Sequence, residues 1–139
     1  MRTTAREMRW LVVSDHRLNV FKYSGDLDGT AIGIRLRSFF SSNPKAIAYS
    51  SLNDLRGYTG SVTYEDMVGM AKMMKTFRPP DLAHKSVLLT RDPAAIYMAK
   101  LARDVFQTEI EVHTDLEAAY ASATGGAAMP PYVRRFIDE

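Results

Sequence analysis

The chain has 139 residues, the size of one domain, and such a domain buries about two-thirds of the surface that its unfolded chain exposes. The absence of cysteine excludes disulfides, thiolate catalysis and cysteine-ligated zinc or iron–sulfur sites. The net charge of +2 is too small to indicate a nucleic-acid or anionic-membrane partner. No apolar run approaches the ~20 residues of a membrane span, and residues 1–9 lack the apolar stretch of a signal peptide, so we expect a cytoplasmic protein.

The first elements predict a β-hairpin followed by a helix. Residues 10–14 and 18–24 have the composition of two strands joined by a short turn. Asp28 supplies an N-cap for the helix, which ends before Pro44. Apolar side chains recur on one face of this helix, at Ile32, Leu36, Phe39 and Phe40.

A second strand and helix occupy the middle of the chain. Residues 46–53 are predicted to form the strand, and residues 54–57 lead into a loop. Thr63 offers a capping hydroxyl to the helix, which ends at residues 78–80 because two prolines lie there. Methionines on this helix are better explained by core packing than by a soft binding surface; the predicted core face carries Met67, Met70, Ala71 and Met74, with Met73 exposed.

Two further strand–helix units complete the pattern. Residues 86–90 are a short apolar run typical of a covered strand, and Asp92 followed by Pro93 starts a helix. Residues 109–113 alternate between apolar and polar, which is typical of a strand near a sheet edge. A capping box at residues 114–117 opens the last helix, which ends at Thr124.

The resulting order is β-β-α-β-α-β-α-β-α. Because each later strand follows a helix, we expect crossover connections and parallel pairing. The sequence therefore predicts one α/β domain over residues 1–123, with a mixed sheet of four or five strands and helices chiefly on one face. Residues 124–139 form a C-terminal tail whose apolar side chains are expected to dock on the domain or to join a second copy in a homo-oligomer.

Three segments carry motifs that follow predicted strands, at residues 54–60, 87–93 and 106–119. Together with the order of elements, they make residues 9–123 similar to the SpoIIAA-like group, which shares the fold of STAS domains, the anti-sigma-factor antagonists. The resemblance implies a mixed four- or five-stranded sheet with helices chiefly on one face. It also implies a role in protein–protein interaction.

In true antagonists, a serine at the helix start after the third strand is phosphorylated to switch partners. The corresponding stretch here, residues 58–66, has hydroxyls at Thr59, Ser61 and Thr63 but lacks the Asp-Ser-Ser/Thr-Gly signature. A phosphate on Ser61 or Thr59 would be favoured by the helix dipole and opposed to a similar extent by the acidic residues that follow. Phosphorylation at these two residues is therefore a hypothesis.

We expect the functional surface in the loop and helix start at residues 56–66. Glycines beside hydroxyls at such a position suit a backbone anion cradle, although turn and capping chemistry explains the same residues and the lysine of a P-loop is missing. Tyr58 is expected to be exposed there. The predicted binding residues are Arg56, Tyr58, Thr59, Ser61 and Thr63.

No catalytic residue, metal ligand or cofactor is predicted, and the balance leans against an enzyme. His16, His84 and His113 lie far apart in the sequence and share no ligand motif. Ser61 lacks the glycine elbow of an activated nucleophile. A pair of arginines in the tail, Arg134 and Arg135, is a weak electrostatic footprint for an anionic surface.

Two function classes remain. The first is a non-enzymatic interaction or regulatory module with an unidentified protein partner, which predicts an exposed surface at residues 58–66 and no deep polar pocket. The second is a small-molecule or anion-binding protein, or an enzyme, that uses the loops at the carboxyl ends of the strands. It predicts a concave pocket with converging Arg56, Asp54 or Arg91 side chains.

Overall fold

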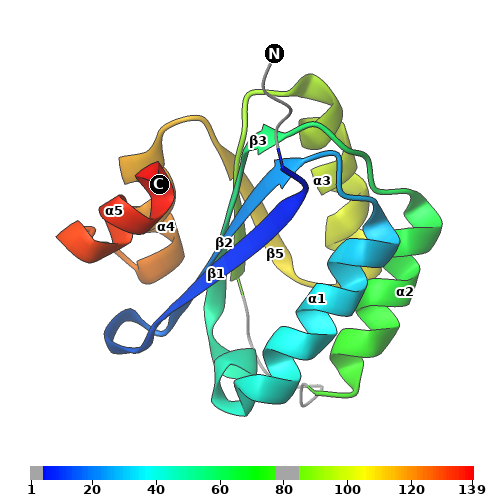
Figure 1. Ribbon diagram of the computed structural model, residues 1–139, viewed down its shortest axis with the longest axis horizontal. Helices are drawn as coiled ribbons and strands as arrows, with labels where there is room; N and C mark the ends of the chain where they lie inside the picture. Colours follow the sequence, from blue (N-terminus) through cyan, green and yellow to red (C-terminus); the bar gives the residue numbers. More distant parts are fainter. Residues whose placement is uncertain (1–4, 78–84) are drawn as a thin grey trace.

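The computed structural model describes residues 5–77 and 85–139, and its elements follow the predicted order with one further helix at the C-terminal end (Figure 1). None of the described helices is long and apolar enough to cross a membrane. The strands are β1 (Glu7–Val13), β2 (Leu18–Gly25), β3 (Ser50–Tyr58), β4 (Lys85–Leu89) and β5 (Glu109–His113). The α-helices are α1 (Gly29–Ser42), α2 (Tyr64–Lys75), α3 (Pro93–Phe106), α4 (Leu116–Thr124) and α5 (Pro131–Asp138).

The five strands form one mixed sheet in the order β1-β2-β3-β4-β5. β1 pairs antiparallel with β2, and all later neighbours are parallel. This arrangement confirms the predicted hairpin, the parallel pairing of residues 86–90 and the edge position of residues 109–113. The α/β fold with a mixed sheet is therefore confirmed.

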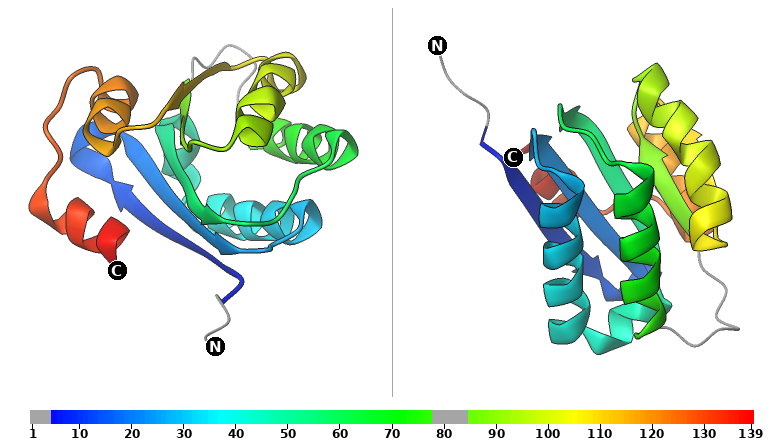
Figure 2. Two further views of the ribbon diagram at one scale, coloured as in Figure 1. Left: turned by 90° about the horizontal axis from the view of Figure 1, so that it is seen from above. Right: turned by 90° about the vertical axis from the view of Figure 1, so that its right-hand side faces the viewer.

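Helices cover both faces of the sheet. α1, α2 and α3 lie against one face, and the shorter α4 and α5 lie against the other (Figure 2). Side chains of a strand alternate between faces, so β2 sends Leu18 and Val20 to the core under α4 and sends Phe21 and Tyr23 to the core under α1. The central strands are thus covered on both sides.

The helix starts follow the predicted caps with one exception. Thr63 and Asp66 cap α2 reciprocally, each side chain accepting a backbone N–H at 3.0 Å. Asp28 and Asp92 likewise cap α1 and α3. At α4 the prediction is wrong, because the cap is Asp115 rather than Thr114. The Asp115 carboxylate lies directly before the first helical residue and accepts a backbone N–H at 2.9 Å.

The third strand begins later than predicted. Pro44 starts a 3-10 helix (Pro44–Ala48), and the side-chain amide of Asn19 in β2 donates to the Ala46 carbonyl at 2.9 Å, which fastens this turn to the sheet. β3 therefore starts at Ser50 and runs to Tyr58. Residues 54–57, predicted to lead from the strand into a loop, belong to the strand.

Burial on α2 follows the predicted face only in part, and α3 buries few of its side chains. Met67, Met70 and Ala71 are buried, as predicted, whereas both Met73 and Met74 are half-buried. On α3 only Ala99 and Ala102 are buried, and the larger side chains of the same face are half-buried. The predicted end of α2 at residues 78–80 and His84 lie outside the described residues.

The C-terminal segment forms α5 and packs on its own domain. Val133 and Ile137 are 0% and 2% exposed and join the core that contains Leu52 and Tyr120. Lys22 of β2 donates a hydrogen bond to the backbone carbonyl of Ile137. The domain boundary at residue 123, and pairing of two copies through this helix, stay predictions.

Candidate functional site

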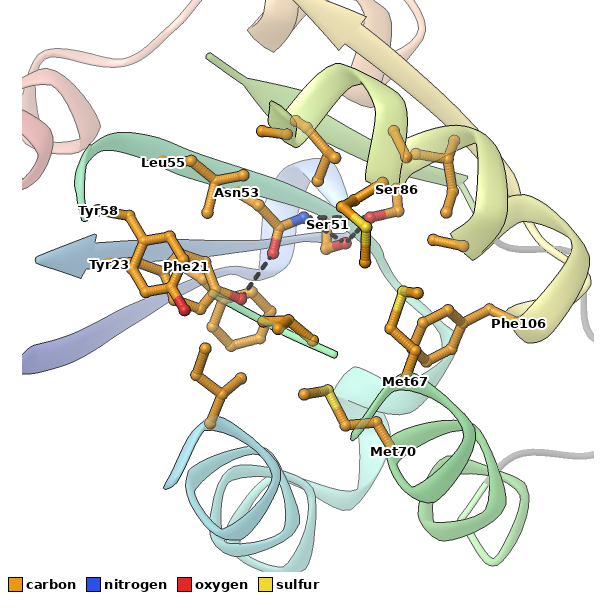
Figure 3. A pocket seen from close by; sticks show the side chains of 18 of the residues that line it. Phe21, Tyr23, Ser51, Asn53, Leu55, Tyr58, Met67, Met70, Ser86 and Phe106 are labelled. Carbon is orange, nitrogen blue, oxygen red and sulfur yellow. Dashed lines mark hydrogen bonds between the residues drawn. The ribbon is translucent and has the colours of Figure 1, made fainter. Parts of the chain in front are cut away.

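A cavity of about 490 Å³ lies between the sheet and helices α1, α2 and α3 (Figure 3). Its volume falls within the range of roughly 300–1,000 Å³ that is typical of small-molecule sites. The cavity accounts for part of the burial pattern of α3, because Met98 and Phe106 line open space instead of filling it. Because most of its walls are apolar, the cavity differs from the pocket of converging Arg56, Asp54 or Arg91 side chains that an anion site predicts.

The walls come from the helices and the floor comes from the sheet. Ile32 of α1, Met67 and Met70 of α2 and Phe106 of α3 line the helical side. They occur at helical spacing on faces that the amphipathic pattern directs toward the sheet. The long methionine side chains adapt their shape readily, which suits a wall that must accept a guest molecule.

Three polar side chains form a row across the floor. In the parallel register Asn19 of β2 lies beside Ser51 of β3, and Ser51 lies beside Ser86 of β4. Asn19 and Ser51 are 1% and 7% exposed, and all three line the cavity. Polar side chains at this depth cost free energy unless they find hydrogen-bond partners.

Asn53 links the serines of this row to Tyr23 through hydrogen bonds. Its amide nitrogen donates toward the hydroxyls of Ser86 (3.1 Å) and Ser51 (3.2 Å) and the Val87 carbonyl (3.3 Å). Its carbonyl oxygen accepts a hydrogen bond from the Tyr23 hydroxyl at 2.9 Å. The network holds the floor in one arrangement (Figure 3).

Asn19 is the exception in this network. Its amide nitrogen donates to the Ala46 carbonyl at 2.9 Å, while its Oδ1 atom is buried and has no hydrogen-bond partner among the described residues. The Ala46 carbonyl is only an acceptor, so it fixes which side-chain atom of Asn19 is the nitrogen. An unpaired acceptor therefore lies in a residue that lines the cavity.

The cavity lining is nearly without charge. Burial raises the pKa of Tyr23, with a further contribution from Tyr58. Burial also raises the pKa of Tyr58, followed by the nearby carboxylates of Asp28 and Asp66, so both phenols are neutral at physiological pH. No lysine, arginine or histidine lines the cavity in the part of the chain that the structure describes, and Asp92 is engaged as the cap of α3.

Tyr58 and Ser61 of the predicted site lie at the cavity. Tyr58 was expected to be exposed, and this is wrong: the residue is half-buried, its ring lies 6.2 Å from that of Tyr23, and its hydroxyl donates to the Leu27 carbonyl at 2.6 Å. Gly60 passes so close to Leu27 that a Cβ atom would collide with the Leu27 carbonyl oxygen. Ser61 lines the cavity and is exposed, so this loop borders the space from the carboxyl end of β3.

Arg56 lies apart from these two residues. Its guanidinium binds the buried Asp54 carboxylate through two contacts of 2.9 and 3.0 Å. That pairing is the main cause of the raised pKa of Arg56, to which Asp138 of α5 also contributes, so Arg56 belongs to the α4–α5 side of the sheet. The strands change register between Lys22 and Ser24, which separates the directions of Arg56 and Tyr58.

Thr59 and Thr63 make hydrogen bonds with backbone groups at the two ends of the loop. Thr59 donates its backbone N–H to the Gly25 carbonyl at 2.8 Å, and its side chain is exposed. The Thr63 hydroxyl is occupied as the cap of α2. The five predicted residues therefore do not converge on one point, and phosphorylation of Ser61 or Thr59 stays a prediction.

The described histidines lie in separate places. His16 Nδ1 lies 2.6 Å from the Tyr120 hydroxyl, and His113 lies 3.3 Å from Glu111. Across residues 5–77 and 85–139, no three histidine, aspartate or glutamate side chains gather in a way that could hold a metal ion.

Sequence reasoning missed the polar floor formed by Asn19, Ser51, Asn53 and Ser86. A signal was present, because each residue interrupts an apolar strand at a position that alternation assigns to a covered face. Three of these residues, Asn19, Ser51 and Ser86, are paired across neighbouring parallel strands and therefore form a polar row.

No family model and no curated protein matches the sequence. An uncharacterised protein of the DUF3478 family from Shewanella loihica, described as having a SpoIIAA-like fold, superimposes with a TM-score of 0.57 at 16% identity, over 88% of this chain and 95% of that one. The chain has the SpoIIAA-like fold. This confirms the fold that the sequence resemblance implied.

Two structures of SpoIIAA itself also match this fold. The anti-sigma factor antagonist in its unphosphorylated form has a TM-score of 0.53 at 17% identity, over 87% of this chain and 100% of that one. The Bacillus cell fate determinant SpoIIAA in the phosphorylated form has a TM-score of 0.53 at 13% identity, over 84% of this chain and 99% of that one.

Proposed function

We propose that the protein is a non-catalytic module that binds a small, largely apolar molecule in the cavity between the sheet and helices α1, α2 and α3. The observation that carries the proposal is the cavity of about 490 Å³, with apolar walls around a few buried polar groups. Most small-molecule sites have this composition, with apolar area supplying affinity and a few polar atoms fixing orientation. This is the second of the two function classes, with an apolar ligand in place of an anion.

The chemistry of the lining favours binding over catalysis. Both tyrosines that line the space have raised pKa values, and neither is poised to exchange a proton near neutral pH. The serine hydroxyls of the floor bind one another and Asn53. None of the described lining residues is a histidine that could activate Ser51 or Ser86 as a nucleophile.

A neutral apolar dye, N-phenylnaphthylamine, tests the proposal by its fluorescence on entering an apolar site. The wild-type protein should bind the dye with saturation at one molecule per chain. Ala95→Trp should weaken this binding, because Ala95 lines the cavity and an indole would occupy part of it. The matched control is Tyr97→Trp on the exposed face of the same helix, where the side chain is 63% exposed. Equal dye binding by both variants, or no saturable binding to the wild-type protein, would contradict the proposal.

A protein-interaction role at residues 56–66 is the second candidate. It is favoured by the exposed Thr59, Ser61 and Tyr64 at this loop and by the likeness of fold to SpoIIAA, which is described as an anti-sigma factor antagonist and is known in phosphorylated and unphosphorylated forms. Ser61→Asp should change the set of proteins that the chain captures from its native cell relative to Ser61→Ala. Identical sets for the two variants would count against a switch at this residue.

A further inference from the structure

We infer that the cavity selects a neutral apolar molecule that ends in a hydroxyl or a primary amide, bound at Asn19 and Ser51. The inference rests on the proposed function and names the ligand class of that same site. It follows from counting the hydrogen-bond donors and acceptors that the floor leaves unpaired.

The acceptor that needs a donor is Oδ1 of Asn19. The atom is buried, belongs to a residue that is 1% exposed, and has no partner among the described residues. The side-chain amide cannot rotate by half a turn to relieve this, because its nitrogen would then leave the Ala46 carbonyl and present an oxygen to it. A ligand that places an O–H or N–H group here removes the cost of the unpaired acceptor.

The donor that needs an acceptor comes from the two serines. Ser51 donates its hydroxyl hydrogen to the Ser86 hydroxyl oxygen at 3.2 Å, which leaves the hydroxyl hydrogen of Ser86 outside that bond. Asn53 donates toward both oxygens, so it takes up neither hydrogen. The Ser86 hydrogen therefore has no acceptor in the described part of the floor. Because hydroxyl hydrogens rotate, the bond can reverse, and Ser51 then carries the free hydrogen.

With the bond reversed, the spare donor on Ser51 and the unpaired acceptor on Asn19 are neighbours. Asn19 and Ser51 are paired residues of adjacent parallel strands, and such strands lie about 4.8 Å apart. A single hydroxyl or primary amide carries both a donor and an acceptor, so it can satisfy both residues at once. A ketone or an ether can satisfy only the serine.

Charge excludes the carboxylate form of the same molecules. An ionised carboxylate has no hydrogen to give to Asn19, and the described lining contains no cation to offset its loss of water. Asp92, the one charged residue in the described part of the lining, would repel it. A fatty acid anion is therefore a poor ligand, whereas its alcohol or amide is a good one.

The test uses two pairs of ligands matched in number of non-hydrogen atoms, at neutral pH, each below its solubility limit and decanoate also below its critical micelle concentration. Calorimetric titration compares decanol with methyl octyl ketone, and decanamide with decanoate. The first member of each pair should bind at least about tenfold more tightly, the factor for a buried acceptor left unpaired at a cost of ~1.4 kcal/mol. Displacement of N-phenylnaphthylamine should follow the same order.

A variant pair assigns the selectivity to Asn19. Asn19→Leu should bind decanol and methyl octyl ketone equally, while Asn43→Leu should keep the wild-type preference. Asn43 is the matched control because its side-chain amide also donates to a backbone carbonyl, that of Phe39, outside the cavity. If Asn19→Leu does not fold, the ligand pairs on the wild-type protein decide the question alone.

The outcomes separate this inference from the proposed function. Equal binding of both members of each pair, with the dye still bound at one molecule per chain, would overturn the inference and leave the proposed function intact. Tighter binding of decanoate than of decanamide would do the same. If neither the dye nor any of the four ligands binds, both fail.

Discussion

The same strands contribute to a filled core on one face of the sheet and to a cavity on the other. On the side of α4 and α5, strands β2, β3 and β4 contribute Leu18, Val20, Leu52, Val87 and Leu89, all 0% exposed in a filled core. On the side of α1, α2 and α3, the alternate positions of the same strands surround a cavity of about 490 Å³. Because strand side chains alternate, one face can carry stability while the other remains free for binding.

The faces also differ in how they handle polar groups. On the filled side Asp54 is buried, and Arg56 satisfies its carboxylate fully. On the cavity side, Asn19 keeps an unpaired acceptor. A buried polar atom without a partner destabilises a fold, and among the described residues this occurs on the cavity side alone. The difference supports the proposed ligand site.

Truncation of one side chain on each face gives the largest expected effect. Leu52→Ala in the filled core should lower the free energy of unfolding by about 3–5 kcal/mol, because it opens a new cavity. Met70→Ala should cost about 2 kcal/mol, since it widens a space that already exists. Urea unfolding measures both. Equal losses would show that the two faces do not differ in packing.

Asn53→Leu should lower stability by about 1–3 kcal/mol, because the Tyr23 hydroxyl then has no acceptor for its hydrogen. Tyr23→Phe removes the same bond from the other side. In a double-mutant cycle, the double variant should be less destabilised than the sum of the two single variants. Additive losses would contradict the polar floor as a coupled network.

Alkaline pH should weaken the fold through tyrosines on both faces. Burial, followed by Tyr132, raises the pKa of Tyr120 on the filled side from 10.0 to about 12, and burial also raises that of Tyr23 on the cavity side. A raised folded-state pKa gives stability that is complete below pH 10 and is lost as the pH rises toward 12, at about 1.4 kcal/mol per pH unit for each group. Urea unfolding over this range should show a shallower decline for Tyr120→Phe. An unchanged slope would contradict a buried, neutral Tyr120.

Most of the fold could be predicted from the sequence because its determinants are local. Three helix starts are predicted from their capping residues, Asp28, Thr63 and Asp92, and each residue forms the expected cap. The start of β3 was predicted too early because the composition of residues 46–48 favours a strand. A contact with a residue distant in the sequence decides the structure there: Asn19 binds Ala46 and fixes a 3-10 turn.

The cavity could not be predicted in the same way. Its volume is a small difference between the space that the elements enclose and the side chains that fill it, and both depend on residues far apart in the chain. The side of the sheet to which Tyr58 points could not be predicted either. It depends on a change of register between Lys22 and Ser24, and no residue type in the sequence indicates that change. Of these features, only the polar row could have been predicted, from the polar residues Asn19, Ser51 and Ser86 in the strands.

The smallest effect is expected at the border of the cavity. Thr63→Ala should cost about 1 kcal/mol, because the backbone N–H of Asp66 loses the hydroxyl that accepts it at 3.0 Å. Thr63→Ser keeps that oxygen and should match the wild-type protein within a few tenths of a kcal/mol. Both changes are read from the midpoint of urea unfolding.

The same cap connects stability to binding. α2 supplies Met67 and Met70 to the cavity wall, and its first turn is held by Thr63 and Asp66. Because Met67 lies one turn from this cap, we expect fraying of that turn to move Met67 before it disturbs the filled core on the other face. Thr63→Ala should therefore weaken N-phenylnaphthylamine binding more than a surface change of equal cost, such as loss of the Asp115 cap on α4. Equal dye affinity in Thr63→Ala and Asp115→Ala would show that the wall of the cavity does not depend on the start of α2.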